Sequence, residues 1–132
     1  MTLVDTNVVV DVLGDDPVWA DWSLAQLAEG ALRGPLLINE VVFAELSVRL
    51  PSLESVDEVL DTFELSLEPT PKAALFTAGK AFDIYKRRGG VRPTVLPDFF
   101  IGAHAAVIEV PILTRDPRHF GSYFPSVRLI TP

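Results

Sequence analysis

The feature that most constrains the fold of this chain is the alternation of short apolar segments with longer segments of helical periodicity. The apolar segments lie at residues 3–4, 36–38, 110–113 and 127–130, and residues 63–67 alternate between apolar and polar side chains. Each is typical of a short strand. Because parallel strands are covered on both faces and need helical crossovers, the alternation indicates an α/β sandwich with a mainly parallel sheet.

Residues that start and stop helices divide the segments between these strands. A short helix over residues 7–13 is expected to end at Gly14. Asp16 followed by Pro17 predicts the start of a second helix, which closes before Gly34. The inner face of this second helix is expected to consist of Val18, Trp22, Ala25 and Leu32.

The same signals predict two helices in the middle of the chain. Asn39 is expected to cap a helix that runs to Leu50, where Pro51 prevents its continuation. Ser55 and Glu58 have the spacing of a capping box, which predicts the start of another helix.

Two further helices are expected in the second half. Thr70 and Pro71 predict the start of a helix that ends at Gly89 and Gly90. Its buried face is expected to contain Ala74, Ala78, Ala81, Phe82 and Tyr85. Residues 96–108 are apolar nearly all round, which indicates a core helix.

The composition limits the chemistry that is open to the chain. With 132 residues it has the size of one domain, and we expect a single domain over residues 1–132. The chain has no cysteine, which excludes disulfides, thiolate zinc sites and cysteine nucleophiles. Two histidines leave little for an imidazole-rich site. Any bound metal must therefore be held by oxygen.

No segment indicates a membrane or a secretory route. No apolar run approaches the ~20 residues of a membrane span. The residues before the first strand contain neither a charged n-region nor a cleavable apolar stretch. We therefore expect a cytoplasmic protein with no membrane partner.

Charge is distributed unevenly along the chain. The net charge of −7 by itself argues against a nucleic-acid ligand, because basic residues supply most phosphate contacts. Residues 1–70 contain fourteen acidic and two basic residues, whereas residues 71–132 contain nine basic and four acidic ones. The second half can therefore face a polyanion. The candidate cations are Lys86, Arg87, Arg88, Arg92, Arg115 and Arg118. Alternatively, Lys86 to Arg88 only complement the dipole of a helix C-terminus.

Four acidic residues are expected at one edge of the predicted sheet. Asp5 and Asp116 follow the ends of strands. Glu45 lies in the helix after the second strand, and Asp98 lies in the first turn of the core helix. Sites in such folds form beyond the carboxyl ends of the strands. Carboxylates that converge there within about 4 to 6 Å would repel by roughly 3 to 4 kcal/mol per pair, so either some of them stay protonated or a divalent cation lies among them. An all-oxygen site suits Mg²⁺ or Mn²⁺.

Each acid also has a local alternative role. Asp5 can cap the turn that follows it, and Glu45 can pair with Arg49 one turn later. Asp98 can stabilise a helix N-terminus, and Asp116 can act as an N-cap. If these acids only capped helices or turns, they would be expected at both edges of the sheet. Because all four are expected at the same edge, a joint site is favoured.

Four motifs, taken in order, resemble the PIN-domain family. They are VDTNV at 4–8, the pair Glu45 and Leu46, PDFFIGAHA at 97–105 and LTRDPRHF at 113–120. In length and motif order the chain is most similar to the VapC-type toxins of type II toxin–antitoxin pairs. The resemblance covers nearly the whole chain. It implies a three-layer α/β/α sandwich with a five-stranded parallel sheet, Mg²⁺ or Mn²⁺ held by the acids, and endonucleolytic cleavage of RNA.

The resemblance also implies roles for individual residues. The four acidic positions of the family are matched by Asp5, Glu45, Asp98 and Asp116. The implied direct metal ligands are Asp5, Asp98 and Asp116. Asn7 and Thr114 match polar positions that orient these carboxylates. His119 lies where many relatives have another acid, so no fifth acidic ligand is expected. His104, on the core helix, is expected to be a packed structural histidine.

The implied chemistry is hydrolysis of an RNA phosphodiester by metal-activated water, which leaves a 5′-phosphate. RNA would be bound by Arg87, Arg88, Arg92, Arg115 and Arg118. The resemblance further implies a cognate antitoxin protein and a homodimer. The RNA that is cut, the number of metal ions and the identity of the antitoxin stay open.

Three other functions fit this sequence less well. A phosphatase of the haloacid-dehalogenase type needs a second Asp two residues after the first, where this chain has Asn7. A receiver domain needs a phosphoacceptor Asp ending the third strand and a Lys ending the fifth, and neither segment supplies one. A catalytically inactive PIN-like interaction module would keep the fold alone, and the intact set of acids speaks against it.

Overall fold

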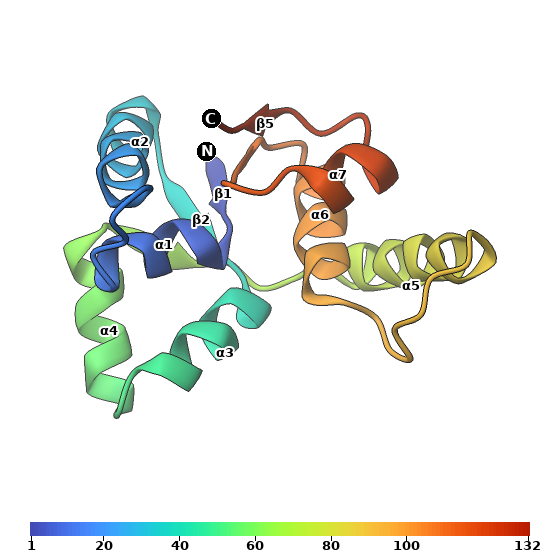
Figure 1. Ribbon diagram of the computed structural model, residues 1–132, viewed down its shortest axis with the longest axis horizontal. Coiled ribbons are helices and arrows are strands. Elements are labelled where there is room, and N and C mark those ends of the chain that lie inside the picture. The colour runs from blue at the N-terminus through green and yellow to red at the C-terminus, as the bar shows by residue number, and fades with distance from the viewer.

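Five short strands form one sheet in the order β3-β2-β1-β4-β5, and every neighbouring pair is parallel (Figure 1). The computed structural model describes residues 1–132. The elements along the chain are β1 (Thr2–Val4), α1 (Thr6–Leu13), α2 (Ala20–Arg33), β2 (Leu36–Ile38), α3 (Glu40–Arg49), α4 (Leu53–Thr62), β3 (Leu65–Leu67), α5 (Lys72–Arg87), α6 (Pro97–Ile108), β4 (Ile112–Leu113), α7 (Arg118–Tyr123) and β5 (Leu129–Ile130). The predicted five-stranded sheet is confirmed.

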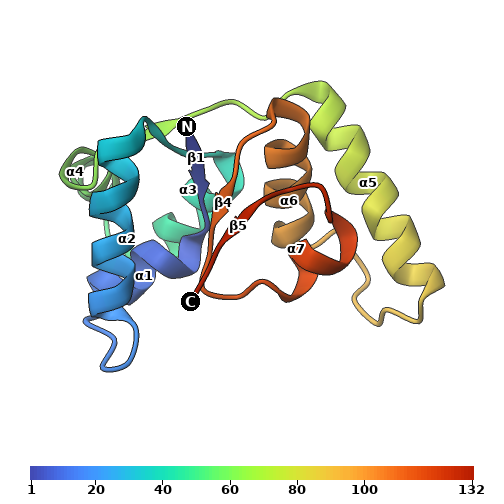
Figure 2. The ribbon, with the colours of Figure 1, turned by 90° about the horizontal axis from the view of Figure 1, so that it is seen from above.

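Helices cover both faces of this sheet, as Figure 2 shows. Helices α1, α2 and α4 lie on one side, and α5, α6 and α7 lie on the other. Helix α3 lies beyond the carboxyl ends of the strands, where it contacts α1, α4 and α6. The three-layer α/β/α arrangement is therefore also confirmed.

Burial explains why such short segments form strands. All three residues of β1 and of β2 are buried, and so are both residues of β4. Central parallel strands are covered on both faces, so they need uninterrupted apolar residues. In the edge strand β3 only Leu65 is buried, and both residues of β5 are half-buried. The core therefore lies on the two faces of the three central strands.

The strand order creates a switch point between β1 and β4. The chain moves outward from β1 to β2 and β3, and then crosses back to β4 on the other side of β1. At such a point the connections leave in opposite directions and open a crevice at the carboxyl ends of the strands. The register pairs Val4 with Leu113, so Asp5 and Thr114 follow side by side. The Asp5 N–H donates to the Leu113 carbonyl over 2.9 Å, which continues the ladder to the edge of the crevice.

The buried face of α2 differs from the prediction. Val18 lies before the first residue of α2 and is 71% exposed, and within the helix Ala25 is exposed and Leu32 is 90% exposed. Of the predicted residues only Trp22 packs against the core, and the buried residues of α2 are Ser23, Leu27 and Gly30. A Cβ on Gly30 would lie 2.9 Å from a methyl carbon of Leu36. The absence of a side chain at residue 30 therefore lets α2 approach β2 closely. A helix face predicted from hydrophobicity alone does not reveal this close approach.

Helix boundaries were less predictable than helix positions. The capping box of α4 pairs Ser52 with Ser55, three residues before the predicted start. Helix α5 begins at Lys72, because Pro71 adopts extended backbone as its N-cap. Helix α7 was not predicted, since its six residues are too few to show a periodic pattern.

Helix α6 is the most apolar helix and packs between the sheet and α5. Phe99 and Ile101 are fully buried. A Cβ on Gly102 would lie 2.2 Å from the Phe124 ring, so this glycine permits the close approach of the segment before β5. No helix in the structure is long and apolar enough to cross a membrane.

Candidate active site

A cavity of about 430 Å³ opens at the switch point between β1 and β4. Its lining residues are Asp5, Thr6, Asn7, Val10, Glu45, Val48, Arg49, Asp98, Arg115 and Asp116. All four acids singled out in the sequence line this one cavity, although they come from four separate parts of the chain. The topology therefore brings together residues that lie up to 111 positions apart.

Asp5 is the most buried of the four acids, with 6% of its surface exposed. The Thr114 hydroxyl donates to its Oδ2 over 2.8 Å, and the Asn7 amide donates to the same oxygen over 3.2 Å. Its Oδ1 accepts no side-chain hydrogen bond. Two side-chain donors thus fix the carboxylate through Oδ2 and leave Oδ1 without a side-chain partner.

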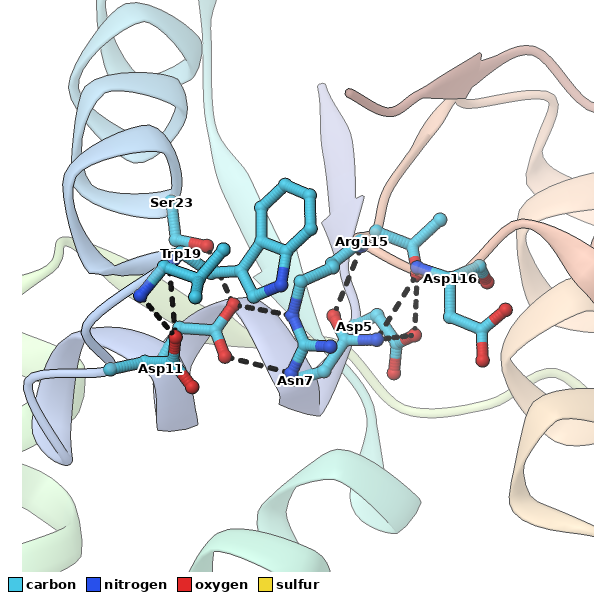
Figure 3. A network of polar contacts seen from close by, with 10 residues as sticks. Asp5, Asn7, Asp11, Trp19, Ser23, Arg115 and Asp116 are labelled. Carbon is cyan, nitrogen blue, oxygen red and sulfur yellow. Dashed lines mark hydrogen bonds and ion pairs between the residues drawn. The ribbon is translucent and has the colours of Figure 1, made fainter.

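Asn7 and Thr114 also join Asp5 to the segment after β4. Figure 3 shows Asn7 together with Asp5 and Arg115. The Asn7 Oδ1 accepts a hydrogen bond of 3.2 Å from the Arg115 backbone N–H. The Thr114 hydroxyl accepts one of 3.0 Å from the Asp116 N–H. Both residues therefore orient Asp5 and hold the ends of β1 and β4 together, which is the arrangement expected of residues that position a carboxylate.

The surroundings of Asp5 favour its protonated form. Burial raises the pKa of Asp5 to about 7, against the hydrogen bond from Thr114 that lowers it. The carboxylates of Asp98 and Glu45 raise this pKa further. A buried acid whose nearest charges are also negative favours its protonated form unless a cation binds.

Glu45 points to the same cavity from α3. Its Oε1 accepts a hydrogen bond of 2.7 Å from the Thr6 hydroxyl, and its Oε2 accepts none. It makes no ion pair with Arg49, although both residues line the cavity. The alternative in which Glu45 serves only as the helical partner of Arg49 is therefore not observed.

Asp98 lies in the first turn of α6 and is about 40% exposed. Its Oδ2 is 2.9 Å from His119 Nδ1, and its Oδ1 is free. The His119 ring stacks on Phe99 with ring centres 5.9 Å apart and the planes at 26°. His119 thus reaches from α7 to an acid of the cavity, a contact that could not be predicted from the sequence.

Asp116 has an internal counter-ion. The Arg118 Nε and Nη2 donate to its two carboxylate oxygens over 2.8 and 2.6 Å. These bonds hold the pKa of Asp116 well below its usual range, at about 2. Asp116 therefore stays ionised, but both of its oxygens are engaged by an arginine that is itself 84% exposed.

The donor set suits a divalent ion that binds carboxylate oxygen. Asp5 Oδ1, Glu45 Oε2 and Asp98 Oδ1 are free, and neither cysteine nor histidine nitrogen is available in the cavity. Such oxygen sets favour Mg²⁺ or Mn²⁺. No three acidic or histidine side chains are close enough in this conformation to share one ion. The tight convergence of four carboxylates expected from the sequence is therefore not observed.

Of the predicted RNA-binding cations, only Arg115 lines the cavity. Arg118 is held by Asp116 at its edge. Arg87 pairs with Asp83 on the surface of α5, at 2.8 Å. Lys86 donates to the Arg92 carbonyl, and Arg88 lies 5.1 Å from the centre of the Tyr123 ring. The group from Lys86 to Arg92 therefore forms a separate surface at the end of α5.

Two further charged residues at the site were missed in the sequence. Arg49 lines the cavity without an ion-pair partner. Asp11 is 2% exposed and forms a bidentate ion pair with Arg115. The available signal for Asp11 was an acid inside the apolar stretch of α1, where a buried carboxylate requires a partner.

His104 is a core residue, as expected. It is fully buried on α6, and its Nδ1 lies 3.3 Å from the Asn39 amide nitrogen. Because that amide is a donor, the histidine nitrogen accepts and the proton lies on Nε2, which has no partner. Burial lowers the pKa of His104, so the ring is neutral. It does not line the cavity.

Comparisons with known proteins agree with this arrangement. The sequence profile of the PIN domain matches residues 2–123. No curated protein matches the chain. The fold is similar to that of VapBC2 from Rickettsia felis, solved bound to a DNA fragment from its promoter, with 20% identity, a TM-score of 0.74 and coverage of 98% of this chain and 97% of the other.

Two other solved structures show the same likeness. VapBC-1 from nontypeable Haemophilus influenzae has 16% identity and a TM-score of 0.72, with coverage of 98% and 96%. VapBC-5 from Mycobacterium tuberculosis, of the VapBC family of toxin–antitoxin systems, has 22% identity and a TM-score of 0.59, with coverage of 99% and 98%. At these identities the structures show a shared fold, while the profile covers nearly the whole sequence. This chain belongs to the PIN domain family, and its structural neighbours are the toxins of VapBC toxin–antitoxin complexes.

Proposed function

We propose that this protein is a metal-dependent endoribonuclease and the toxin of a toxin–antitoxin pair. The observation that carries the proposal is the cavity at the switch point of a PIN-domain sheet, which is lined by Asp5, Glu45, Asp98 and Asp116. The raised pKa of Asp5 supports it, because burial and the carboxylates of Asp98 and Glu45 disfavour the charged form of Asp5, which a bound cation would stabilise.

Asp5, Asp98 and Asp116 would hold Mg²⁺ or Mn²⁺, with Glu45 as a fourth acid. When bound, the ion lowers the pKa of water and neutralises charge on the phosphate. Asp98 and Asp116 are half-exposed, and to share an ion they would turn toward Asp5, which Thr114 and Asn7 hold in place. For Asp116 this requires that it leave Arg118.

The chain's own residues contribute orientation and proton handling. The free Oε2 of Glu45 can accept a hydrogen bond from water in the cavity, while Thr6 fixes Oε1. The water oxygen attacks phosphorus, the bond from phosphorus to the 3′ oxygen breaks, and that oxygen takes up a proton. The products are a 5′-phosphate and a 3′-hydroxyl, and no side-chain nucleophile is needed.

RNA affinity must come from cations around the acidic cavity, because the acids themselves repel phosphate. Arg115 at the cavity and Arg118 at its edge are the nearest candidates. Arg87, Arg88 and Arg92 would extend the contact along the end of α5. If these last three bind phosphates, neutralising two of them reduces the slope of log affinity against log salt concentration by about 2.

The proposed partners are an RNA substrate, a cognate antitoxin and a second copy of the chain, in the cytoplasm. Several structural neighbours were solved as VapBC assemblies, and one is described as a toxin–antitoxin complex from Klebsiella pneumoniae. Those descriptions concern the neighbours, and they motivate a search for a small antitoxin encoded next to this chain.

A second candidate is an inactive PIN-like interaction module. The observation that favours it is that no three acids share an ion-binding geometry and Asp116 is already paired. The phosphatase alternative has less support, because the Asn7 amide is committed to Asp5 and to the Arg115 backbone.

The deciding experiment incubates purified protein with tRNA, rRNA and mRNA in Mg²⁺, Mn²⁺ or a chelator. We expect cleavage with metal, none with chelator, and none from Asp5→Ala or Asp98→Asn. The Asp98→Asn variant keeps the size of the side chain, so a folded variant that cleaves at the normal rate would refute the assignment. Wild-type protein that binds no metal and cleaves no RNA would favour the interaction module.

A further inference from the structure

A buried acid outside the four predicted ones binds an arginine that lines the cavity. Asp11 of α1 accepts hydrogen bonds of 2.8 Å from Nε and from Nη2 of Arg115, one at each carboxylate oxygen (Figure 3). The Ser23 hydroxyl of α2 donates to Asp11 Oδ2 over 2.9 Å. Asp11 therefore binds the segment after β4 and a second helix at the same time.

Arg115 is held on several sides. Its backbone N–H donates to Asn7 Oδ1, and its guanidinium carbon lies 5.8 Å from the centre of the Trp19 ring. The Arg115 side chain is 31% exposed and lines the cavity. Of its three side-chain nitrogens, only Nη1 makes no contact with Asp11.

Stability is a weak explanation for this ion pair. Removing two charges from water costs about as much as their attraction returns, and apolar replacements of buried pairs are often neutral or stabilising. What a bidentate pair does provide is a fixed orientation of the guanidinium plane. An arginine that is already ordered loses little side-chain entropy when it binds an anion.

We propose that Asp11 is a positioning residue that holds Arg115 at the rim of the acidic cavity, so that the free Nη1 binds an RNA phosphate. The inference rests on the proposed ribonuclease function. Arg115 and Arg49 are the only cations that line the cavity, and Arg115 is the one whose direction is fixed. Asp11 acts through Arg115 and does not touch the RNA.

The change of net charge and the loss of positioning predict opposite effects of Asp11→Asn on RNA affinity. Removal of an acid makes the protein less negative, which by general electrostatics tightens RNA binding. Loss of the carboxylate that orients Arg115 instead weakens RNA binding. We expect a roughly tenfold weaker affinity, the size of one charged hydrogen bond. The probe is a fluorescein-labelled single-stranded RNA, followed by anisotropy with Ca²⁺ in place of Mg²⁺ to limit cleavage.

The matched control is Asp15→Asn, which makes the same change of charge four residues away. Asp15 is exposed and makes no side-chain hydrogen bond, and its φ of 48° is in the left-handed region, which Asn tolerates. We expect its RNA affinity to equal or slightly exceed that of the wild type.

A second variant guards against misfolding of Asp11→Asn. Arg115→Lys keeps the positive charge and loses the planar fork, and we expect a similar loss of affinity with a higher KM and little change in kcat. The double variant should bind RNA no more weakly than either single one, because both act through one contact. If the two substitutions instead caused independent structural defects, their losses of binding free energy would add.

The outcomes separate this inference from the proposed function. If Asp11→Asn or Arg115→Lys binds RNA as tightly as the wild type, or if their losses add, Asp11 does not position Arg115 for RNA. If the wild type cleaves RNA while these variants keep full affinity, only this inference is lost. If the wild type neither binds nor cleaves RNA, the proposed function and this inference both fail.

Discussion

The Thr114 hydroxyl donates a 2.8 Å hydrogen bond to Asp5 Oδ2 across 109 positions of sequence. This contact joins the carboxyl ends of β1 and β4, where the two central strands end side by side. It also selects which oxygen of Asp5 stays free for a ligand. The orientation of the most buried acid therefore depends on a residue that the sheet alone brings next to it.

Replacing Thr114 with Val should impair the site through Asp5. The hydroxyl lowers the pKa of Asp5, so its loss raises that pKa further and disfavours the ionised form at neutral pH. We expect the acidic limb of the pH–rate profile for RNA cleavage to move to higher pH, and the rate near neutral pH to fall by roughly tenfold. Thr77→Val on α5, which removes a hydroxyl that bonds only Ala73 O, is the control. An unshifted profile would show that Thr114 does not tune Asp5.

The pKa of Asp5 also predicts how stability depends on pH in metal-free protein. Between 3.8 and about 7 the folded protein keeps a proton on Asp5 that the unfolded chain has released. Stability therefore falls as pH rises through this window, by up to roughly 4 kcal/mol from this group. Burial of neutral His104 acts in the opposite direction, because its lowered pKa costs stability as pH falls.

The comparison with Asp5→Asn isolates the contribution of Asp5. Urea unfolding in chelator at about pH 5 and about pH 8 should show that the variant gains stability relative to the wild type as pH rises. The lowered pKa of Asp116 does not interfere, because it titrates at about 2. A constant difference between the two proteins across this range would contradict the raised pKa.

Arg118 should compete with a metal ion for Asp116. Both Asp116 oxygens are bound by the Arg118 guanidinium, which is exposed and free to leave. We expect Arg118→Ala to bind Mn²⁺ roughly two- to fivefold more tightly by calorimetry, as suits an exposed ion pair. Arg118→Lys keeps the charge without the bidentate contact, so its Mn²⁺ affinity should lie between those of the wild type and Arg118→Ala. Equal Mn²⁺ affinity in all three proteins would exclude Asp116 as a ligand.

Gly102 and Gly79 form a matched pair for the packing of the fold. A Cβ on Gly102 would lie 2.2 Å from the Phe124 ring, whereas a Cβ on Gly79 meets nothing within 4 Å. Gly102→Ala should therefore lower the free energy of unfolding by about 1–3 kcal/mol. Gly79→Ala, on the exposed side of α5, should raise it by roughly 0.5–1 kcal/mol through helix propensity. Denaturant titration of both variants tests this contrast, and a neutral Gly102→Ala would show that Phe124 repacks freely.

The buried faces of helices were predicted correctly where apolar residues recur with helical periodicity. They were predicted wrongly where small or hydrogen-bonded polar residues make the contacts. The Ala-rich face of α5 and the cap at Asn39 were correct. The predicted inner face of α2 was correct at Trp22 and wrong at Ala25 and Leu32. Gly30 is buried there because of its small size, and Ser23 because its hydroxyl forms a hydrogen bond with Asp11. Neither property registers as hydrophobicity.

The sequence by itself determined the parallel α/β class and which acids lie at the carboxyl edge, because each depends on local patterns of apolar and capping residues. Only the tertiary structure decided which partner each acid has. Arg118 binds Asp116, His119 binds Asp98, and Arg115 turns away to Asp11. Such pairings depend on side-chain directions to within a few ångströms, and the strand register and helix packing set these directions together.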